Sequence, residues 1–533
     1  MPVTTIPLVG SLTARGFAKT IGTSAKDQQY INCLFESAVN PALGKKAVYV
    51  VKRPGSTTGS TIASGVQALI SYSSYFTSMS TTGTAIYRGT TSLGTISGAV
   101  TSLNLSDTVM SAQDVICFCD STGKSGWYCF KDAVTTNFPT FTGDTHTNTV
   151  IDNISSTTGL YPGQAISGTG IQAATRIATI TSSTAITTTL ATTATNAGVT
   201  ITKEAIAKVI DSDYPNGSVV SVAANNGYMF SGTADGRIFN GAINAPNTVA
   251  AADYITADYS ADALAYLFKF GDYIIAIGGN SLQYFQITGN SSGSVLSAVR
   301  SLNKYFTETM LAPIFVGGDA YMLAASTDTG ESLYRMSSPT SFEKVSDPIT
   351  GGVMGDLILD SIGMASFPTN RKVLLIHDLT GDRTDILAYD PTSRMWSVFT
   401  LSAGMTSSYG SSFTKTGAST LFTWASGNTY TDSTVAYTMT IQTEPFVLND
   451  GKPFIINSVE LIGDTQASGT TVFSTSSDDY ASFVAREPFN MTETNKVSRR
   501  CGYYRNHAIF KFEHSANTAF RAQALKVHWE PAG

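Results

Sequence analysis

Residues 265–286 read AYLFKF-GD-YIIAI-GGNS-LQYFQ, and this stretch decides the fold. Its three apolar or alternating runs, 265–270, 273–277 and 282–286, are separated by Gly-Asp and Gly-Gly-Asn turns. Gly, Asn and Asp supply the positive φ angles that tight hairpins need. Runs of about four to eight residues rich in aromatic and β-branched side chains are typical of strands. The stretch therefore predicts antiparallel strands joined by short hairpins.

Units of the same kind recur along the chain. Apolar runs that open a unit begin near Leu69, Val109, Val219, Ala263, Ile314, Met364 and Met405. Most lie about 40 to 51 residues apart, the period of propeller blades with four strands each. One interval, from Val109 to Val219, is 110 residues long, and it contains the stretch 141–203, which is dense in Thr, Ser, Ala and Ile. Removing those 63 residues leaves a gap of about 47, which predicts an inserted module within one blade.

These patterns predict an all-β chain: a β-propeller of six or seven blades, an inserted small β module and a C-terminal β-sandwich-like domain. In the insert, alternating β-branched residues and turns such as Tyr161-Pro162-Gly163 favour a folded module over a low-complexity linker. From about Glu444 the strands are separated by longer loops, which favours a sandwich. The expected divisions are an N-terminal segment with the first blades (1–140), the insert (141–203), the remaining blades (204–440) and the sandwich-like domain (441–533).

The composition excludes some classes of function. Charged residues make up 14% of the 533 residues, against roughly 25% in an average soluble chain. The 33 basic and 39 acidic residues give a net charge of −6, which argues against a nucleic-acid reader built on a basic surface. The N-terminus lacks the features of a signal peptide, and no apolar run reaches membrane-spanning length. We therefore expect no membrane insertion.

The cysteine pattern predicts buried thiols in a protein folded in a reducing cytoplasm. The five cysteines are Cys33, Cys117, Cys119, Cys129 and Cys501. An odd number in a chain of this length does not make a disulfide framework. Cys117 and Cys119 lie two apart in an apolar run, so both should face one side of a strand. A metal site would need more ligands at suitable spacing.

Two short motifs resemble parts of enzyme sites and have simpler interpretations. The sequence GNSSG at 289–293 matches the nucleophile-elbow pattern, but it lacks the strand-to-helix context that this motif requires. Gly123-Lys124-Ser125 resembles the end of a phosphate loop, but Phe118 stands where that loop needs its first glycine. We expect a hairpin turn at 123–125 and no catalytic role for either motif.

The titratable residues that lie close together in sequence do not match the pattern of a catalytic or metal-binding site either. His377-Asp378 ends an apolar run, which favours a strand-terminal polar pair over a base and its orienting carboxylate. Asp378, Asp382 and Asp385 do not match a calcium-loop spacing, and Asp478-Asp479 would face opposite sides of a strand. His507 and His514 have no cysteines nearby to complete a zinc site. We therefore predict a protein that is not an enzyme, with no catalytic residues, no metal site and no cofactor.

Several segments, read in their order, resemble a phage family. The N-terminal part contains DQQYINCLFE at 27–36 and KRPG at 52–55, and the centre contains ADYSADAL at 257–264 and GGNSLQYF at 278–285. Further likeness lies in AYDP at 388–391 with Trp396, in RCG at 500–502 with Arg505, and in AIF at 508–510. Together they resemble the tail-hub, nozzle or packaged-DNA stabilisation proteins of short-tailed bacteriophages. The resemblance covers most of the chain except 141–203.

The resemblance implies a structural virion protein. Such proteins form a homo-hexameric ring below the portal and adaptor rings, beside tail fibre, spike or needle proteins. The ring retains packaged DNA and later serves as the conduit for its ejection, with double-stranded DNA passing without specific binding. The location would be the virion tail, assembled in the host bacterial cytoplasm. Six copies at −6 would carry about −36, and an acidic lumen would repel phosphate and let the duplex slide.

Within this interpretation, basic residues serve protein–protein docking. We predict partner contacts at Arg53, Arg499, Arg500 and Arg505, because guanidinium forks suit carboxylates. A solvated positive edge or an internal salt bridge is the alternative for these residues.

Two other functions compete with the structural one. The first is a receptor-binding or glycan-cleaving phage tail protein, and the second is a host enzyme on a propeller scaffold. Tail proteins of the first class usually have β-helical rungs of about 20–25 residues, and the longer period found here argues against them. The sequence has no acid–base cluster and no secretion signal, and both absences argue against the host enzyme.

Overall fold

The computed structural model is almost entirely β-structure. The residues that it describes are 2–9, 29–39, 46–53, 55–61, 66–70, 79–82, 84–88, 91–96, 103–120, 122–135, 139–258, 262–290, 293–303, 308–309, 313–316, 318–326, 330–338, 341–345, 362–367, 373–378, 385–400, 420–422, 428–433 and 437–532. Within them lie one short α-helix, α1 (Lys131–Thr135), and one 3-10 turn, η2 (Asn449–Gly451).

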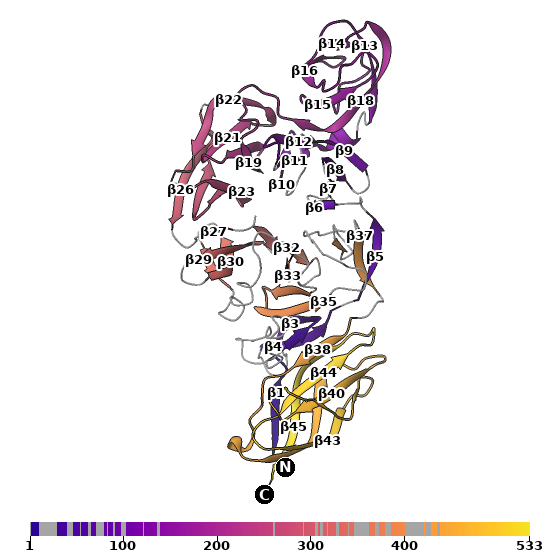
Figure 1. The fold of residues 1–533 in the computed structure, drawn as a ribbon, viewed down its shortest axis with the longest axis vertical. Helices are drawn as coiled ribbons and strands as arrows, with labels where there is room; N and C mark the ends of the chain where they lie inside the picture. Colours follow the sequence, from indigo (N-terminus) through magenta and orange to yellow (C-terminus); the bar gives the residue numbers. More distant parts are fainter. Residues whose placement is uncertain are drawn as a thin grey trace.

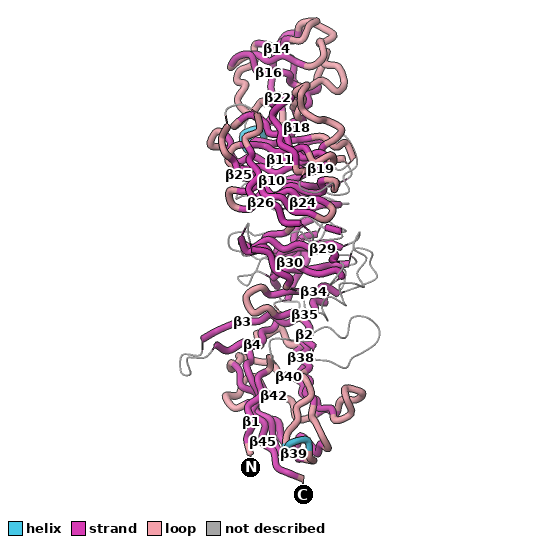
Figure 2. The backbone as a smooth tube through the Cα atoms, turned by 90° about the vertical axis from the view of Figure 1, so that its left-hand side faces the viewer, coloured by secondary structure: helices cyan, strands magenta, loops and turns pink. Residues whose placement is uncertain are grey.

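The molecule is elongated and has three parts (Figures 1 and 2). The insert lies at one end, a group of small sheets forms the middle, and a sandwich at the other end holds both termini.

Seven small antiparallel sheets follow one another along the described residues of the middle part. The first three blades are β6 (Val66–Ile70), β7 (Met79–Thr82), β8 (Ala85–Arg88) and β9 (Thr91–Thr95); β10 (Leu103–Met110), β11 (Gln113–Asp120), β12 (Gly126–Phe130) and β18 (Asn196–Lys208); and β19 (Val219–Asn225), β20 (Tyr228–Thr233), β21 (Arg237–Ala242) and β22 (Ala245–Thr256). The next two are β23 (Leu264–Phe270), β24 (Tyr273–Gly278), β25 (Ser281–Ile287) and β26 (Leu296–Asn303); and β27 (Glu308–Thr309), β28 (Ile314–Val316), β29 (Asp319–Ser326), β30 (Gly330–Ser338) and β31 (Ser341–Lys344). The last two are β32 (Ile362–Phe367), β33 (Val373–Asp378), β34 (Asp385–Asp390) and β35 (Met395–Thr400); and β36 (Thr420–Phe422) and β37 (Asn428–Ser433) with β5 (Gly55–Thr61).

The predicted hairpins are confirmed by their backbone angles. The stretch quoted first forms β23, β24 and β25, with Gly271 at φ 59° in its first turn. In the third blade, Asn226 and Gly227 have φ angles of 48° and 81° between β19 and β20. Positive φ is the conformation that Gly and Asn adopt at least cost, so the turn residues fix where each strand ends.

Among the described residues, hydrophobic clusters join neighbouring blades from the first to the sixth. Trp127 of the second blade packs with Ile86 of the first, and Phe230 of the third packs with Leu267 of the fourth. Further clusters join the second blade to the third, the fourth to the fifth and the fifth to the sixth. The second to fifth blades thus each pack against both neighbours in sequence, which is how propeller blades pack.

Polar contacts also join the first strands of neighbouring blades. The Ser106 hydroxyl on β10 accepts from the Ala224 N–H at 2.8 Å, and Ser221 on β19 accepts from the Leu267 N–H at 2.7 Å. The seventh sheet is completed by β5, which pairs with β37 from the far end of the chain. These features confirm the predicted all-β propeller, and the described residues contain seven blades.

Six of the seven predicted unit starts fall on or beside the first strand of a blade, and the one near Met405 lies outside the described residues.

The insert is a folded β module within the second blade. Its strands are β13 (Thr140–Thr145), β14 (Val150–Asp152), β15 (Gln164–Ser167), β16 (Ile177–Ser182) and β17 (Ala185–Thr188), together with the first part of β18. It has its own apolar core, in which Phe141, Ile151, Leu160 and Ile186 are buried. The chain leaves the blade after β12 and returns along β18, which pairs with β13 and then with β12. One strand therefore belongs to both the insert and the blade.

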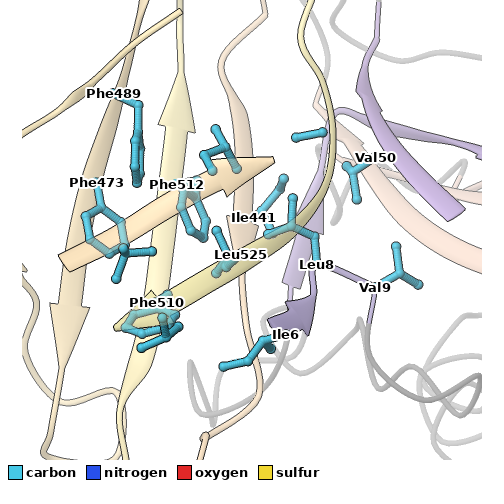
Figure 3. Packing of buried hydrophobic residues seen from close by; sticks show 14 of the residues in the cluster. Ile6, Leu8, Val9, Val50, Ile441, Phe473, Phe489, Phe510, Phe512 and Leu525 are labelled. Carbon is cyan, nitrogen blue, oxygen red and sulfur yellow. The ribbon is translucent and has the colours of Figure 1, made fainter. Parts of the chain in front are cut away.

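The sandwich combines both ends of the chain. One sheet contains β1 (Val3–Pro7), β3 (Cys33–Val39), β4 (Lys46–Lys52), β45 (Arg521–Pro531), β39 (Phe454–Gly463) and β43 (Lys496–Tyr504). The other contains β2 (Gln29–Ile31), β38 (Met439–Gln442), β44 (Ile509–His514), β40 (Thr470–Ser476), β41 (Val484–Ala485) and β42 (Phe489–Asn490). Phe473, Phe512 and Leu525 pack with Ile6 and Val50 in the core between them (Figure 3).

The sandwich and the sixth blade share one continuous sheet. β2 lies between β35, to which it is parallel, and β38, to which it is antiparallel. β2, β3 and β4 therefore belong to the sandwich and precede the first blade in sequence.

The outer edges of the blades follow one pattern. β18 and β35 are each covered by an added strand, β13 and β2 respectively. The pairings of β9, β22, β26, β31 and β5 each contain a register shift. Bulges and covering strands both keep sheet edges from pairing with other chains.

Candidate functional site

Arg53, one of the predicted contact residues, lies inside the protein. Only 2% of it is exposed. Its guanidinium lies between the rings of Phe399 and Tyr437, at 4.4 and 4.2 Å from their centroids. Nη1 also donates to the carbonyl of Thr400 at 3.2 Å. These contacts are intramolecular and join the sixth blade to the sandwich, but they are ring contacts and a carbonyl hydrogen bond and not the internal salt bridge considered from the sequence.

Asn32 completes this sandwich joint, which we define as Tyr30, Asn32, Arg53, Phe399 and Tyr437. The Asn32 amide nitrogen donates to Thr400 Oγ1 at 2.8 Å and to the Thr438 carbonyl at 2.9 Å. Its side-chain oxygen accepts from the Thr400 N–H at 3.0 Å. Asn32 holds φ at 54°, a conformation that Asn tolerates better than most residues. Segments 27–36 and 52–55, which carry the family resemblance, thus meet in the joint.

Lys52, next to Arg53 in the strand, points the other way, into the sandwich. Its ammonium donates to the Ala516 carbonyl, and burial lowers the pKa of Lys52. Burial also lowers the pKa of nearby His514, with a smaller contribution from the Lys52 charge. The His514 ring is hydrogen-bonded to Thr471 Oγ1 at 3.0 Å and Thr518 Oγ1 at 3.1 Å. His514 therefore has a structural role in the sandwich.

A second buried cation lies between the insert and its blade. Lys203 is 2% exposed, and its ammonium donates to the carbonyls of Ala133 in α1 and Gly159 in the insert, each at 2.8 Å. Burial lowers the pKa of Lys203 to about 8. The sequence analysis missed this residue. The signal was present, because Lys203 follows Val199 and Ile201 on the inward face of an alternating strand.

Aromatic side chains surround this insert joint, which we define as Tyr128, Phe130, Asp132, Tyr161 and Lys203. The Tyr161 ring stacks on Phe130 with centroids 4.2 Å apart, and its hydroxyl donates to Asp132 Oδ1 at 2.6 Å. Tyr128 donates to the Pro162 carbonyl at 2.5 Å. The insert is therefore held by a shared strand, a stacked pair and several polar contacts.

The other three predicted contact arginines lie on the surface of the sandwich. Arg499 and Arg500 are exposed on β43, and Arg505 is exposed in the loop that follows. The Arg499 N–H donates to Glu487 Oε2 at 3.1 Å. All three therefore lie on or just after β43, whereas Arg53 is buried in the sandwich joint.

The motifs considered for enzyme chemistry fall in hairpins. Gly123, Lys124 and Ser125 form the predicted turn between β11 and β12, with Lys124 at φ 46°. The GNSSG sequence joins the antiparallel strands β25 and β26, and its Ser291 lies outside the described residues. His377 and Asp378 end β33, as expected for a strand-terminal pair.

The carboxylate candidates are structural where their side chains are described. Asp478 accepts from Ser482 Oγ at 2.5 Å and from Ser476 Oγ at 2.7 Å. These hydrogen bonds, that from Ser482 first, lower the pKa of Asp478 to about 2. Asp382 lies outside the described residues. The Asp478 carboxylate therefore closes the turn between β40 and β41.

All five cysteines are buried free thiols, as predicted. Cys117 and Cys119 lie in the same hydrophobic cluster, on one face of β11. The described part of the chain contains no group of three or more His, Cys, Asp or Glu side chains that could hold a metal ion. Among the same residues, no helix is long and apolar enough to cross a bilayer.

Comparison with known proteins finds likeness in fold only. No protein-family model matches the sequence, and no curated protein does. Similar structures include the β-propeller domain of Cps50 (Swd1) from Myceliophteria thermophila, at 7% identity, TM-score 0.39, covering 71% of this chain and 100% of that one. BamB from Moraxella catarrhalis matches at 11% identity and TM-score 0.32, covering 72% and 100%. The WD40 β-propeller domain of Doa1 matches at 10% identity and TM-score 0.35, and the match covers 71% of this chain and 97% of that one. These scores are low, so the fold assignment rests on the strand pairing described above.

Proposed function

We propose that this chain is a structural subunit of a short-tailed bacteriophage tail. Copies of it would form a homo-hexameric hub or nozzle ring below the portal and adaptor. The ring would retain packaged DNA and then conduct it during ejection. The identity of the assembly comes from the sequence resemblance to tail-hub and nozzle proteins, and the structure supports the mechanical part of the proposal.

The observation that carries the proposal is the continuity of β-structure along the molecule. The sandwich sheet runs through β2 into the sixth blade, and β18 runs from the second blade into the insert. Each transition is fixed by a buried cation, Arg53 or Lys203. Such a subunit transmits force along its long axis without a hinge, which a ring stacked in a tail requires.

A narrow propeller centre supports a conduit between subunits. The Lys269 ammonium on β23 and Asp107 Oδ1 on β10 form an ion pair at 2.5 Å, although these strands begin blades that are two apart. The first strands therefore approach each other too closely to admit a duplex, whose major groove alone is about 12 Å wide. In this proposal the DNA passes through the lumen of the ring of subunits.

Electron microscopy of intact particles tests the proposal. We expect six copies around a continuous axial channel below the portal. Three copies at the tail periphery would instead favour the alternative, a receptor-binding or glycan-cleaving tail protein, and assays of glycan binding and hydrolysis would follow. Absence of the chain from virions would overturn both.

A further inference from the structure

Three exposed arginines of the sandwich lie on or just after an edge strand. β43 is the last strand of its sheet, so one of its edges has no strand partner there. Arg499, Arg500 and Arg505 are exposed, and the Tyr503 side chain between them is 54% exposed. We call these four residues the basic edge.

A β-bulge aims the arginines outward. Ile456 and Ser458 of β39 pair with Gly502 and Arg499, so β43 has one extra residue within this segment. Arg500 has φ 56°, a conformation that is uncommon for a residue other than Gly. Neighbouring strand residues normally face opposite sides, yet Arg499 and Arg500 are both exposed. The bulge thus accounts for two consecutive arginines that are both exposed.

A fourth arginine lies beneath the bulge. Arg486 Nη2 is so close to Gly502 that a Cβ at that position would lie 2.7 Å from it. Arg486 Nε donates to Thr475 Oγ1 at 2.9 Å, which fixes the side chain. Glycine at 502, with φ 115°, is therefore needed for the close approach of the guanidinium.

The basic edge differs from other arginines of the protein. Arg237, Arg335 and Arg521 each hold at least one carboxylate within 3.1 Å. In the part of the chain that the structure describes, no salt bridge joins Arg499, Arg500 or Arg505 to a carboxylate. Charge on an edge strand can simply prevent aggregation. An exposed tyrosine among the arginines adds nothing to that protection, whereas Tyr and Arg are the residues enriched where interfaces bind tightly.

The protein itself has a surface of opposite charge. The described residues of 1–53 and 441–533, which form the sandwich, contain 12 basic and 11 acidic residues, a net charge of +1. The described residues of 54–440, the blades with the insert, contain 12 basic and 22 acidic residues, a net charge of −10. Asp213 and Asp272 are among the exposed carboxylates of the blades.

We infer that the basic edge docks on the acidic propeller of a second copy of this chain. The contact is heterologous, since two different patches meet, and such contacts generate rings when the rotation closes. Complementary charge between the arginines and the acidic blades favours this arrangement over propeller-to-propeller contacts, which would bring like charges together. The inference rests on the proposed ring and names the contact that would build it.

Zero-length cross-linking tests the contact directly. Full chains carrying Arg500→Lys or Arg505→Lys are mixed as ¹⁴N and ¹⁵N forms, concentrated, and treated with a carbodiimide, which couples amines to carboxylates in contact. We expect the introduced amine to couple to carboxylates within 54–440 of the other isotopic form. Coupling only within one copy, coupling only to sandwich carboxylates, or a chain that stays monomeric at every concentration would overturn the inference.

A charge-reversal variant provides a second test of the inferred contact. Arg500→Glu should weaken self-association about tenfold in sedimentation experiments at low salt, with a smaller effect at high salt because screening weakens the native contact. Lys452→Glu makes the same charge change at an exposed site of the same sandwich and should leave association unchanged. Equal effects of the two variants would overturn the inference, and unchanged thermal unfolding of both shows that the fold is intact.

The failure of this inference differs from that of the proposed function. Hexameric rings in particles without the cross-link would retain the function and reject the basic edge. If the chain forms the cross-linked dimer but is absent from virions, the basic edge is retained and the proposed function is rejected.

Discussion

The sandwich joint and the insert joint are built in the same way, but from residues with very different separations in sequence. Each attaches a β module to the outer strand of a blade, and each buries one cation to 2% exposure. The insert joint brings together residues 128–203, which are near neighbours in sequence. The sandwich joint brings Arg53 to Phe399 and Tyr437. A local joint can form as its own module folds, whereas a distant joint requires that the propeller close first.

The cations also differ in how they are held. The Arg53 guanidinium is planar and lies between two aromatic rings, a geometry that Lys cannot reproduce. Lys203 is a compact charge that donates to two carbonyls. The two joints should therefore respond differently to mutation and to pH, and five experiments compare them.

The largest effect should follow Arg53→Ala. Loss of two desolvated cation–π contacts and a charged hydrogen bond should destabilise the protein by about 3 kcal/mol. Hydrogen exchange should show lost protection in β35 and β38, and thermal unfolding should shift downward. The control is Arg505→Ala, an exposed arginine, which should change stability by less than about 0.5 kcal/mol. Equal shifts for both variants would reject the structural role of Arg53.

A smaller and more local effect should follow Lys203→Met. The two carbonyls lose their shared donor, which should cost about 2 kcal/mol. Faster hydrogen exchange should be confined to α1 and the insert strands. Lys124→Met, at an exposed lysine in a turn of the same blade, serves as the control.

Combining the two variants sharpens the comparison. Separate joints should give additive losses in the Arg53→Ala, Lys203→Met double variant. Loss of protection in the sandwich of the Lys203→Met single variant would show that the joints are coupled.

Tyr161→Phe should weaken the insert joint by about 1 kcal/mol, because one hydrogen bond to Asp132 is lost while the stack on Phe130 remains. Differential scanning fluorimetry of Tyr161→Phe beside Tyr503→Phe provides the measurement, since Tyr503 is exposed. A shift in the second variant as large as in the first would argue against a special role for the Tyr161 hydroxyl.

The smallest effect, between about pH 7 and about pH 8, should be a pH dependence of the insert joint alone. Burial lowers the folded-state pKa of Lys203 from 10.5 to about 8, so the unfolded chain binds more protons at this site above about pH 8. Stability from this group therefore rises with pH across the window from about 8 to about 10.5, with only a few tenths of a kcal/mol gained between about pH 7 and about pH 8. The stability difference between wild type and Lys203→Met should grow accordingly in urea titrations. A difference that stays constant with pH would contradict the lowered pKa.

Much of the fold was predictable because its signals are local. Turn residues such as Gly271 and Asn226 marked the hairpins, and the blade period located the insert. Lys203 could have been found from strand alternation, since it shares the inward face with Ile201. The burial of Arg53 could not, because nothing near KRPG indicates the two aromatic rings from the far end of the chain.

The sequence by itself determined the strands, the turns, the repeat and the separate nature of the insert, because hairpin chemistry and apolar alternation act between near neighbours. Only the tertiary structure decided that β5 completes the last blade with β37, and that β2 joins the sixth blade to the sandwich. The physical reason is that such long-range pairings depend on loop closure and on the complementary faces of elements far apart in the chain. The same long-range pairing turned Arg53 from an expected surface contact into the buried centre of a joint.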